Sequence, residues 1–394
     1  MNITDKTHLT FNTLDWYEYD EIIKEEDIEN KENIKPIKQY IIKVFGKTKS
    51  GESVYLKIKN FTPHFYISYD QTWDDKKIKL FINHLKTLRQ SLQNHLIEYD
   101  VVKRKNFYGF TDKPQLFIRL IFNNMSEMRE CSKLFDKKMT IYKISTRPFE
   151  FKVFESNINP YLRFIHIKDL TSVGWISIDR KKLFLNEDDE TTTKISFDVD
   201  WMDINPNNDP NLGIAPFKVC SFDIECLSMD KGFPQANRPE DTICQIGVTF
   251  NNYGDIKIYK RYLFNLDSCD PIPNCEVKQC KNEKELLIEF TEMIKKEDPD
   301  ILTGYNIFGF DEKYIYDRCQ LNKNRCFDEF SELSKILNIN CKFVEKSLSS
   351  SALGDNIMRY FDTIGRLQID LLKVVQRDYK LNSYKLDKVA EHFY

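Results

Sequence analysis

The chain has 394 residues, of which 41% are hydrophobic and 30% are charged, so it can bury the cores of two or three domains and is too apolar for wholesale disorder. Its formal net charge of −3 gives no support for nucleic-acid binding, although an acidic metal site would offset a local basic groove. The sequence shows neither an apolar signal core at Met1–Lys6 nor a run of about eighteen apolar residues, so we expect a soluble intracellular protein without a membrane span.

The ten cysteines are scattered along the chain, and none forms a Cys-x-x-Cys pair. Several of them lie inside predicted apolar strands or helices. A disulfide framework or a zinc ribbon is therefore not expected, and reduced, buried thiols are the better interpretation.

Residues 1–35 combine an aromatic opening with an acidic run from Asp20 to Glu32, which predicts a solvated loop or a surface helix. We treat these residues as an N-terminal extension. From Tyr40 onward, period-two alternation predicts strands, and apolar residues three or four positions apart predict helices. The strands are expected at 40–46, 53–59, 61–69, 116–122, 149–154, 162–167 and 173–176, and the helices at 76–97 and 126–138.

Residues 36–215 are therefore predicted to form a strand-rich N-terminal domain of the α+β class. The segment 203–216 is rich in Asn and Pro and is typical of a linker. Within the domain, residues 103–105 are all basic and precede Phe107 and Tyr108, which makes a candidate basic-aromatic strip for nucleic acid. A solvated surface is the alternative that the sequence favours.

The next predicted strand, Lys218–Cys226, carries two acids one position apart. Because strand side chains alternate between faces, Asp223 and Glu225 share one face, and Phe222 and Ile224 pack on the other. Two bare carboxylates this close repel each other unless a proton or a cation lies between them. The strand therefore has a reason to bind metal, although Asp-x-Glu is a common triplet and is weak evidence alone.

Residues 216–394 are predicted to form a second domain, of the α/β class, with a mixed sheet and helices packed against it. Asp311 falls at the start of one of the helices, where free backbone N–H groups favour an acid for purely structural reasons. Gly304 could likewise be a turn glycine. The strands are expected at 243–250, 256–264 and 301–305, with a turn at 251–255, and the helices at 282–296 and from 311 to 318.

Two motifs resemble a known family. Phe222-Asp223-Ile224-Glu225 followed by Gly304-Tyr305-Asn306-x3-Phe310-Asp311 is similar to the first two exonuclease motifs of family B DNA polymerases. The spacing of the motifs, the lead-in Asp298-Pro299-Asp300-Ile301-Leu302 and segments at 53–66, 154–164 and 365–389 are similar as well. Within the family, the chain resembles the delta-like polymerases of eukaryotes and large DNA viruses. The resemblance implies a ribonuclease H-like (DEDD) exonuclease fold for the second domain.

The resemblance also implies a site. Asp223, Glu225 and Asp311 are similar to three of the four catalytic acids, which hold two Mg²⁺ ions in the complete site, with Mn²⁺ as an alternative. Asn306 and Phe310 match positions near the 3′-terminal nucleotide. The implied substrate is DNA, as a single-stranded 3′ end or a primer-template.

The family's fourth acid lies in a Tyr-x3-Asp motif downstream of the segment 380–389. Tyr379-x3-Ser383 and Tyr384-x3-Lys388 lack the acid, and nothing in the chain resembles the polymerase palm motifs. We therefore expect the N-terminal and exonuclease part of a DNA-directed DNA polymerase for replication and proofreading, from a truncated, split or interrupted gene, with little exonuclease activity in isolation. One alternative is a non-catalytic module that binds DNA or a separately encoded C-terminal polymerase fragment. A weaker alternative is a stand-alone DEDD nuclease. The implied location is the host nucleus, or a cytoplasmic viral factory if the chain is viral.

Overall fold

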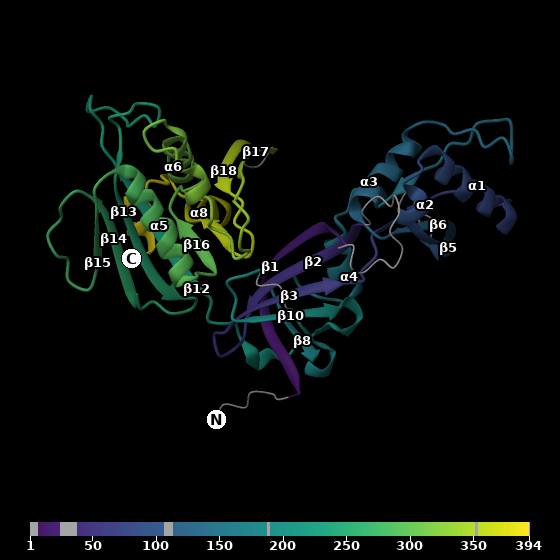
Figure 1. Ribbon diagram of the computed structural model, residues 1–394, viewed down its shortest axis with the longest axis horizontal. Helices are drawn as coiled ribbons and strands as arrows, with labels where there is room; N and C mark the ends of the chain where they lie inside the picture. Colours follow the sequence, from purple (N-terminus) through teal and green to yellow (C-terminus); the bar gives the residue numbers. More distant parts are fainter. Residues whose placement is uncertain (1–6, 24–37, 106–112, 187–189, 351–353, 394) are drawn as a thin grey trace.

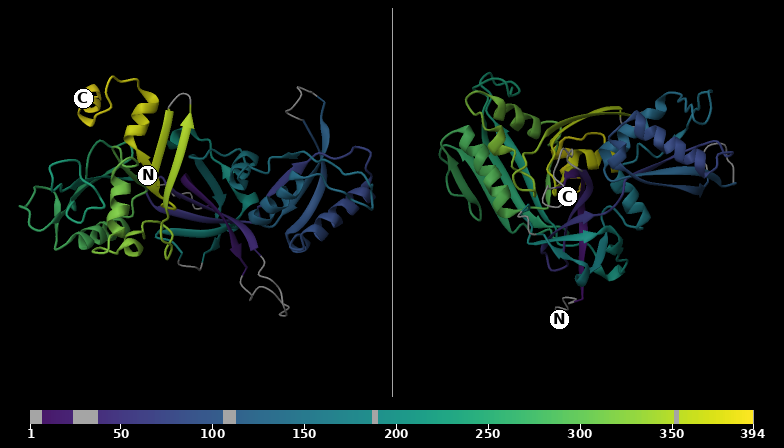
Figure 2. Two further views of the ribbon diagram at one scale, coloured as in Figure 1. Left: turned by 90° about the horizontal axis from the view of Figure 1, so that it is seen from above. Right: turned by 45° about the vertical axis from the view of Figure 1, so that its right-hand side comes forward.

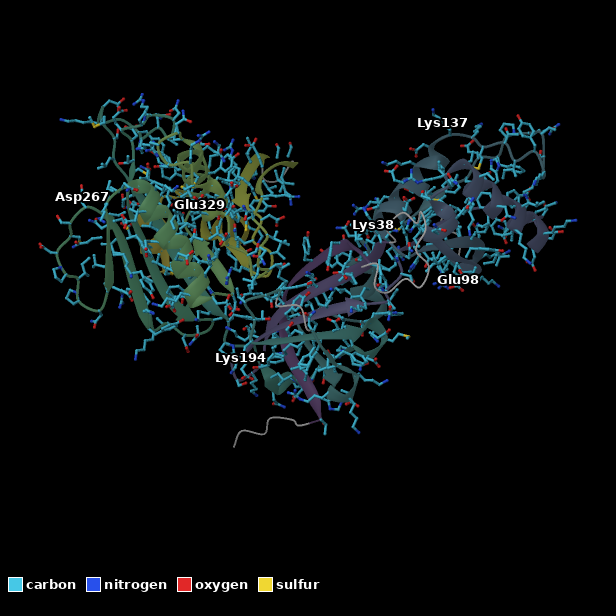
Figure 3. The ribbon with its side chains drawn as sticks, viewed as in Figure 1. Lys38, Glu98, Lys137, Lys194, Asp267 and Glu329 are labelled. Atoms are coloured by element: carbon cyan, nitrogen blue, oxygen red, sulfur yellow. The ribbon has the colours of Figure 1, made fainter. Side chains whose placement is uncertain are left out.

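The structure, a computed structural model, describes residues 7–23, 38–105, 113–186, 190–350 and 354–393. Three β-sheets of four or more strands organise these residues, and each is associated with its own hydrophobic core. The seven-stranded sheet lies between the four-stranded and the six-stranded sheets (Figure 1). Charged side chains project from all three parts, as the labelled Glu98, Lys194 and Asp267 illustrate (Figure 3).

The seven-stranded sheet contains the long strand β1 (His8–Ile22), which was predicted as a solvated loop or surface helix; that prediction was wrong. Leu9 and Phe11 are only 1% and 0% exposed, so burial of this aromatic opening overrides the acidic character of the following residues. Residues 24–32 of the acidic run lie outside the described residues. The strand order is β11 (Asn205–Pro206), β8 (Trp175–Asp179), β1, β2 (Lys38–Lys47), β3 (Ser53–Lys59), β10 (Ile195–Asp200) and β9 (Phe184–Leu185).

Residues 162–167 were predicted as a strand but belong to the helix α4 (Pro160–Ile167). Pro160 at the first helical turn fixes a helical φ and needs no hydrogen-bond acceptor for its nitrogen. Phe164, which is fully buried, packs edge-on to Phe61 in the core of the seven-stranded sheet. The short apolar run was ambiguous by periodicity, and the proline was the better signal.

The four-stranded sheet has the order β5 (Leu96–Arg104), β6 (Gln115–Phe122), β4 (His64–Ile67) and β7 (Val153–Phe154). In chain order the unit reads β4, two helices, β5, β6, a helix and β7. Both helical segments cover one face of the sheet, because their side chains share one core with the central strands. Phe65 and Leu120 of the central strands are fully buried in the same core as Phe81 and Leu85 of the first helix. The helices are α1 (Asp75–Leu88), α2 (Leu92–His95) and α3 (Met125–Lys133).

The six-stranded sheet positions the candidate site. Its order is β15 (Glu276–Cys280), β14 (Lys260–Leu266), β13 (Ile243–Asn252), β12 (Lys218–Cys226), β16 (Ile301–Gly304) and β19 (Leu367–Asp370). β12 runs antiparallel to β13 and parallel to β16, so this is the mixed sheet that the sequence predicted. Phe222 of β12 packs against Phe290 of the covering helix α5 (Glu283–Glu297), with 5.6 Å between the ring centroids.

Further helices and a hairpin complete the C-terminal part. The hairpin of β17 (Phe343–Ser350) and β18 (Gly354–Phe361) and the C-terminal helices project from one side (Figure 2). The helices are α6 (Asp311–Gln320), α7 (Phe327–Phe330), α8 (Leu371–Asp378) and α9 (Leu386–Phe393). Short 3₁₀ turns occupy Leu134–Asp136, Arg180–Lys182, Trp201–Asp203 and Pro210–Leu212.

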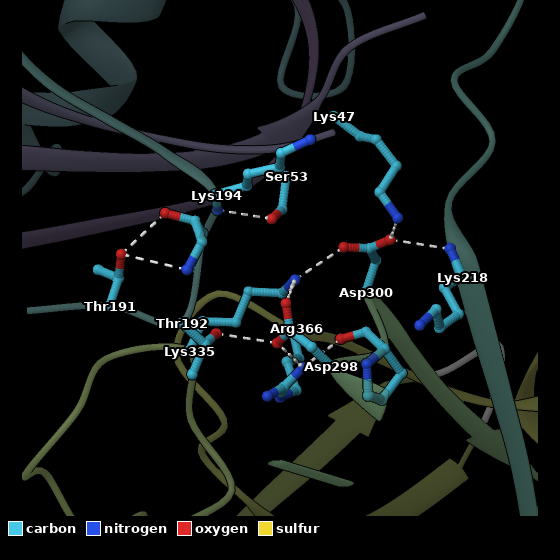
Figure 4. Close-up of polar contacts among 12 residues, drawn as sticks. Lys47, Ser53, Thr191, Thr192, Lys194, Lys218, Asp298, Asp300, Lys335 and Arg366 are labelled. Atoms are coloured by element: carbon cyan, nitrogen blue, oxygen red, sulfur yellow. Dashed lines mark hydrogen bonds and ion pairs between the residues drawn. The ribbon is translucent and has the colours of Figure 1, made fainter. Parts of the chain in front are cut away.

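A buried ionic cluster joins the seven-stranded and six-stranded sheets (Figure 4). Asp300, just before β16, receives hydrogen bonds from the ammonium groups of Lys47 on β2 and Lys335, the latter at 2.8 Å. The backbone N–H of Lys218 donates to the same carboxylate at 2.8 Å. These contacts fix the start of β12 and β16 to the N-terminal sheet.

All ten cysteines are free in the structure, six of them buried and four half-buried. Among the residues that the structure describes, no helix is long and apolar enough to cross a membrane.

Candidate active site

The alternation predicted for β12 is present. Asp223 and Glu225 lie on the exposed side of the strand, whereas Phe222 and Ile224 are 6% and 5% exposed in the core of the sheet. The apolar face anchors the strand under α5, so the two carboxylates project from a backbone that the core holds in place.

Asp311 meets this strand from the neighbouring helix. It is the first residue of α6 and is only 3% exposed. Its Oδ1 accepts a hydrogen bond from the backbone N–H of Ile224 at 3.2 Å, between the two strand acids. The charges of Asp311 and Asp223 also act on each other, which places the two carboxylates close together. The structure therefore brings together the acids of the first and second motifs, which are 88 positions apart in the sequence (311 − 223).

The electrostatics of the three acids reflect this crowding. Burial, followed by the negative charge of Asp223, raises the pKa of Asp311 to about 7. Burial and the charge of Glu225 raise the pKa of Asp223 in turn. Near neutral pH and without a cation, the Asp223–Asp311 pair therefore retains a proton for part of the time, because two adjacent carboxylates do not both ionise freely.

The bend before α6 depends on a close approach of two strands. A Cβ on Gly304, at the end of β16, would lie 2.6 Å from the carbonyl oxygen of Phe222 and 2.5 Å from the Cγ2 of Ile307. Gly304 is thus a strand residue that lets β16 lie against β12, and not the turn glycine considered from the sequence. Asn306, with φ of 65°, makes the turn itself, and its carbonyl accepts from the N–H groups of Gly309 and Phe310.

Asp370 holds this bend, although no sequence motif pointed to it as part of the site. It follows Ile369 at the end of β19 and is 2% exposed. Its Oδ1 accepts from the N–H of Asn306 at 2.8 Å and its Oδ2 from that of Phe308 at 3.1 Å. With a third bond from Leu372, its oxygens are committed to the backbone, so we assign it a structural role.

An aromatic pair lies beside the acids. Phe310 directly precedes Asp311, and its ring is 5.3 Å from that of Phe233, which is 69% exposed. Phe233 was also missed, because an isolated Phe in a loop carries no sequence signal. The side chain of Asn306 instead lies over Gly309, where an added Cβ would come within 2.2 Å of its Oδ1. The predicted nucleotide-contact residues thus lie on one bend.

The donor set fits a hard divalent cation, since carboxylate oxygens are the ligands that Mg²⁺ prefers. Burial and the negative charge of Asp223 raise the pKa of Asp311, so a cation beside this pair would relieve the repulsion between the two carboxylates. Within the described part of the chain, however, no group of three or more His, Cys, Asp or Glu side chains is arranged to hold a metal ion. Glu225 shares the strand face, but the three acids do not form a preassembled cage.

A separate groove of about 890 Å³ lies on the four-stranded sheet, on the face opposite α1 and α3. Tyr66 of β4 pairs with Arg119 of β6 and with Phe154 of β7 across the sheet. The guanidinium of Arg163, from α4, lies 5.6 Å from the centre of the Tyr66 ring. Arg104, from the predicted basic-aromatic strip, also lines the groove, while Phe107 and Tyr108 lie outside the described residues.

Two family models match the chain. The model for the DNA polymerase family B exonuclease domain matches residues 151–389, more than half of the chain. The model for the DNA polymerase delta catalytic subunit-like N-terminal domain matches residues 60–129. The matches cover both the groove and the acidic site.

Individual proteins give the same result. A DNA polymerase of Acanthamoeba polyphaga mimivirus is 34% identical, with 97% of this chain and 26% of the viral protein covered. The DNA polymerase delta catalytic subunit of Dictyostelium discoideum is 32% identical over 89% of this chain and 32% of its own length. The structure of the family B DNA polymerase from Pyrobaculum calidifontis superposes with a TM-score of 0.62 at 17% identity, over 97% of this chain and 39% of that one, which shows a shared fold. The chain thus spans less than half of each of these proteins.

Proposed function

The chain belongs to the family B DNA polymerases, of which it carries a delta-like N-terminal region and the ribonuclease H-like exonuclease region, and we propose that, as part of a whole polymerase, it serves the removal of 3′-terminal nucleotides for proofreading during DNA replication. The hydrogen bond from the Ile224 N–H, between the two strand acids, to Asp311 carries this proposal, because it joins two distant motifs at one point. We further propose residues 36–215 and 216–394 as its two domains, with DNA synthesis as the activity of the whole polymerase. The proposed location is the host nucleus or, for a virus, a cytoplasmic factory.

We propose that Asp223, Glu225 and Asp311 hold two Mg²⁺ ions, or Mn²⁺ as an alternative. When bound, the ions would supply a water deprotonated near neutral pH and charge compensation at the leaving oxygen. The acids themselves are kept in register by β12 and α6, which share the bond from the Ile224 N–H to Asp311. Asn306 and Phe310 are proposed to contact the terminal nucleotide, with Phe233 extending the aromatic surface on which a base can stack.

The groove on the four-stranded sheet supports DNA as the partner. It combines aromatic rings with guanidinium groups on the open face of a sheet, which suits bases and phosphates of a single strand. Arg119 is held by two hydrogen bonds to Asp100, at 2.8 and 2.5 Å, so its position is fixed before any ligand binds. A DNA-binding role without hydrolysis is the second candidate function, and this groove is the observation that favours it.

The test is trimming of a 5′-labelled single-stranded oligonucleotide by the polymerase that carries this chain. With Mg²⁺, we expect stepwise shortening from the 3′ end, and Asp223→Ala is expected to abolish it. Equal trimming by wild type and Asp223→Ala would rule out the assigned site. Oligonucleotide binding that survives without any trimming, in wild type as in the variant, would favour the second candidate.

A further inference from the structure

A buried arginine and its partner glutamate lie behind the candidate active site. We propose that Arg318, paired with Glu283, is a positioning residue for this site: it fixes the segment 227–242, and with it Phe233, so that a single-stranded 3′ end finds a preformed aromatic surface beside the acids. The proposal rests on the proposed exonuclease function and deepens it, by naming what sets the affinity for the strand end.

Every N–H group of the Arg318 guanidinium is used. The side chain is fully buried, and Nε and Nη2 donate to the two carboxylate oxygens of Glu283, each at 2.6 Å. Nη1 donates to the carbonyl oxygens of Ala236 at 3.0 Å and Arg238 at 2.6 Å, and Nη2 also donates to that of Pro239 at 3.2 Å. Five donors thus meet five acceptors, three of them on the backbone of a single surface segment.

Glu283 completes the support from the other side. Its carboxylate is 3% exposed and also accepts from the backbone N–H of Ile243 at 2.9 Å, at the start of β13. The side-chain amide of Asn324 donates to it at 2.8 Å. The carboxylate that pairs with Arg318 is therefore itself held in place. The hydrogen bonds from Arg318, Asn324 and Ile243 keep the pKa of Glu283 below its usual range despite the burial.

The same segment is held at a second point. The buried carboxylate of Asp241 accepts from the backbone N–H groups of Met229 at 3.2 Å and Gln235 at 2.8 Å. The hydroxyl of Tyr314 donates to the carbonyl oxygen of Asp241 at 2.7 Å. Two side chains of one helix, Tyr314 and Arg318, therefore bind the backbone of this segment.

That helix is α6, which begins with Asp311. Positions 311, 314 and 318 lie three and four residues apart and share one face of the helix. The acid is thus connected to the segment through one rigid element: its first turn meets β12, and its second and third turns hold the loop. Arg318 is suited to this because a planar fork can bind a carboxylate and several carbonyls at once, which a lysine ammonium cannot.

The position of Phe233 explains why such a support is useful. Its ring is 69% exposed and contacts Phe310 at its edge, with 5.3 Å between the centroids. An exposed ring gains little from burial, so its orientation depends on the backbone that carries it. A ring held in place before the strand arrives binds a base without the cost of ordering the loop.

The proposal is tested with Arg318→Lys in the 394-residue chain, which retains the charge and loses the fork. Two readouts are compared in metal-free buffer: hydrogen exchange of the amides in 227–242, and binding of a short oligothymidylate by fluorescence anisotropy. Relative to wild type, we expect Arg318→Lys to speed exchange in 227–242 more than it speeds exchange in β12 and β13. We also expect it to weaken oligothymidylate binding about fivefold or more, the lower range for the loss of one base-stacking contact. Unchanged exchange in the segment would overturn the proposal.

A double-mutant cycle separates positioning from general stability. If Arg318 acts through Phe233, the double variant Arg318→Lys/Phe233→Ala binds no more weakly than the worse single variant, whereas additive losses would contradict the proposal. If Arg318→Lys does not fold by circular dichroism, Tyr314→Phe, which removes the bond to the Asp241 carbonyl, takes its place in the same cycle. Neither readout needs hydrolysis. A polymerase without trimming activity would therefore refute the proposed function without affecting what the exchange and binding measurements say about Arg318.

Discussion

Replacing Asp300 with Asn should loosen the attachment of the candidate exonuclease domain to the N-terminal sheet. Asp300 is 2% exposed and faces two ammonium groups, on Lys47 and Lys335, whose side chains are 7% and 2% exposed. Asn keeps the shape but leaves both buried cations without this carboxylate. Removing one partner of a buried ion pair costs about 3–5 kcal/mol, so we expect a loss of that size in the free energy of unfolding.

The assay is urea unfolding, followed by circular dichroism and by the fluorescence of the four tryptophans, of which Trp175 packs against the cluster that contains Ile301 of β16. Glu329→Gln is the matched control, since Glu329 lies on the surface and pairs with the exposed Lys284 at 3.4 Å. A loss for Asp300→Asn no larger than for Glu329→Gln would refute the importance of the cluster.

The same cluster predicts a pH dependence. Lys335 lowers the pKa of both Asp298 and Asp300, against the effect of burial. A carboxyl group whose folded pKa is depressed contributes stability above its unfolded pKa of about 3.9, and that contribution is lost as the pH falls through the folded pKa. We therefore expect wild type to lose stability below about pH 4 and the difference between wild type and Asp300→Asn to shrink there.

Three further predictions concern the sites. Gly304→Ala should lower the free energy of unfolding in urea by about 1–3 kcal/mol, because the added Cβ meets the Phe222 carbonyl. Gly247→Ala should change it little, because no atom lies within 4 Å of the added Cβ. Equal losses would contradict the close approach. Binding of Mn²⁺ should strengthen as the pH rises from 6 to 8, because Asp311, whose pKa is raised to about 7, must lose its proton before it binds a cation. An affinity that does not change with pH in titration calorimetry would argue against this acid as a ligand. Arg119→Ala should weaken anisotropy-measured binding of single-stranded DNA and lower its salt dependence by the equivalent of about one phosphate contact, while Arg377→Ala, an exposed arginine paired with its neighbour Asp378, should not.

The local parts of the site followed from the sequence, and its long-range parts did not. The alternation in β12 placed Asp223 and Glu225 on one face because a strand has a period of two, and the acid at the start of α6 followed from helix-end chemistry. The motif resemblance then joined the two elements. The predicted domain boundary at 215/216 stays a prediction, although β12 does begin at Lys218.

The missed residues act through contacts between segments far apart in the chain. Asp370 binds a backbone N–H 64 positions away, and Arg318 binds Glu283 35 positions away, and neither pairing has a periodic signature in the sequence. Strand β1 was missed for a different reason, because local charge was taken as a sign of exposure while burial of Leu9 and Phe11 decided the outcome. Propensity and charge are weak where tertiary packing is strong.

The central claim is that Asp223, Glu225 and Asp311 form one divalent-cation site. Its most direct test is a Mn²⁺ titration of the 394-residue chain, followed by electron paramagnetic resonance, for wild type, Asp311→Asn and Asp317→Asn. Asp317 lies on the same helix, paired with Lys313, and serves as the control. The site predicts saturable binding by wild type and the control and a loss of at least about tenfold in affinity for Asp311→Asn, since an amide oxygen lacks the charge that a hard cation requires. Equal affinities for wild type and Asp311→Asn would contradict the claim.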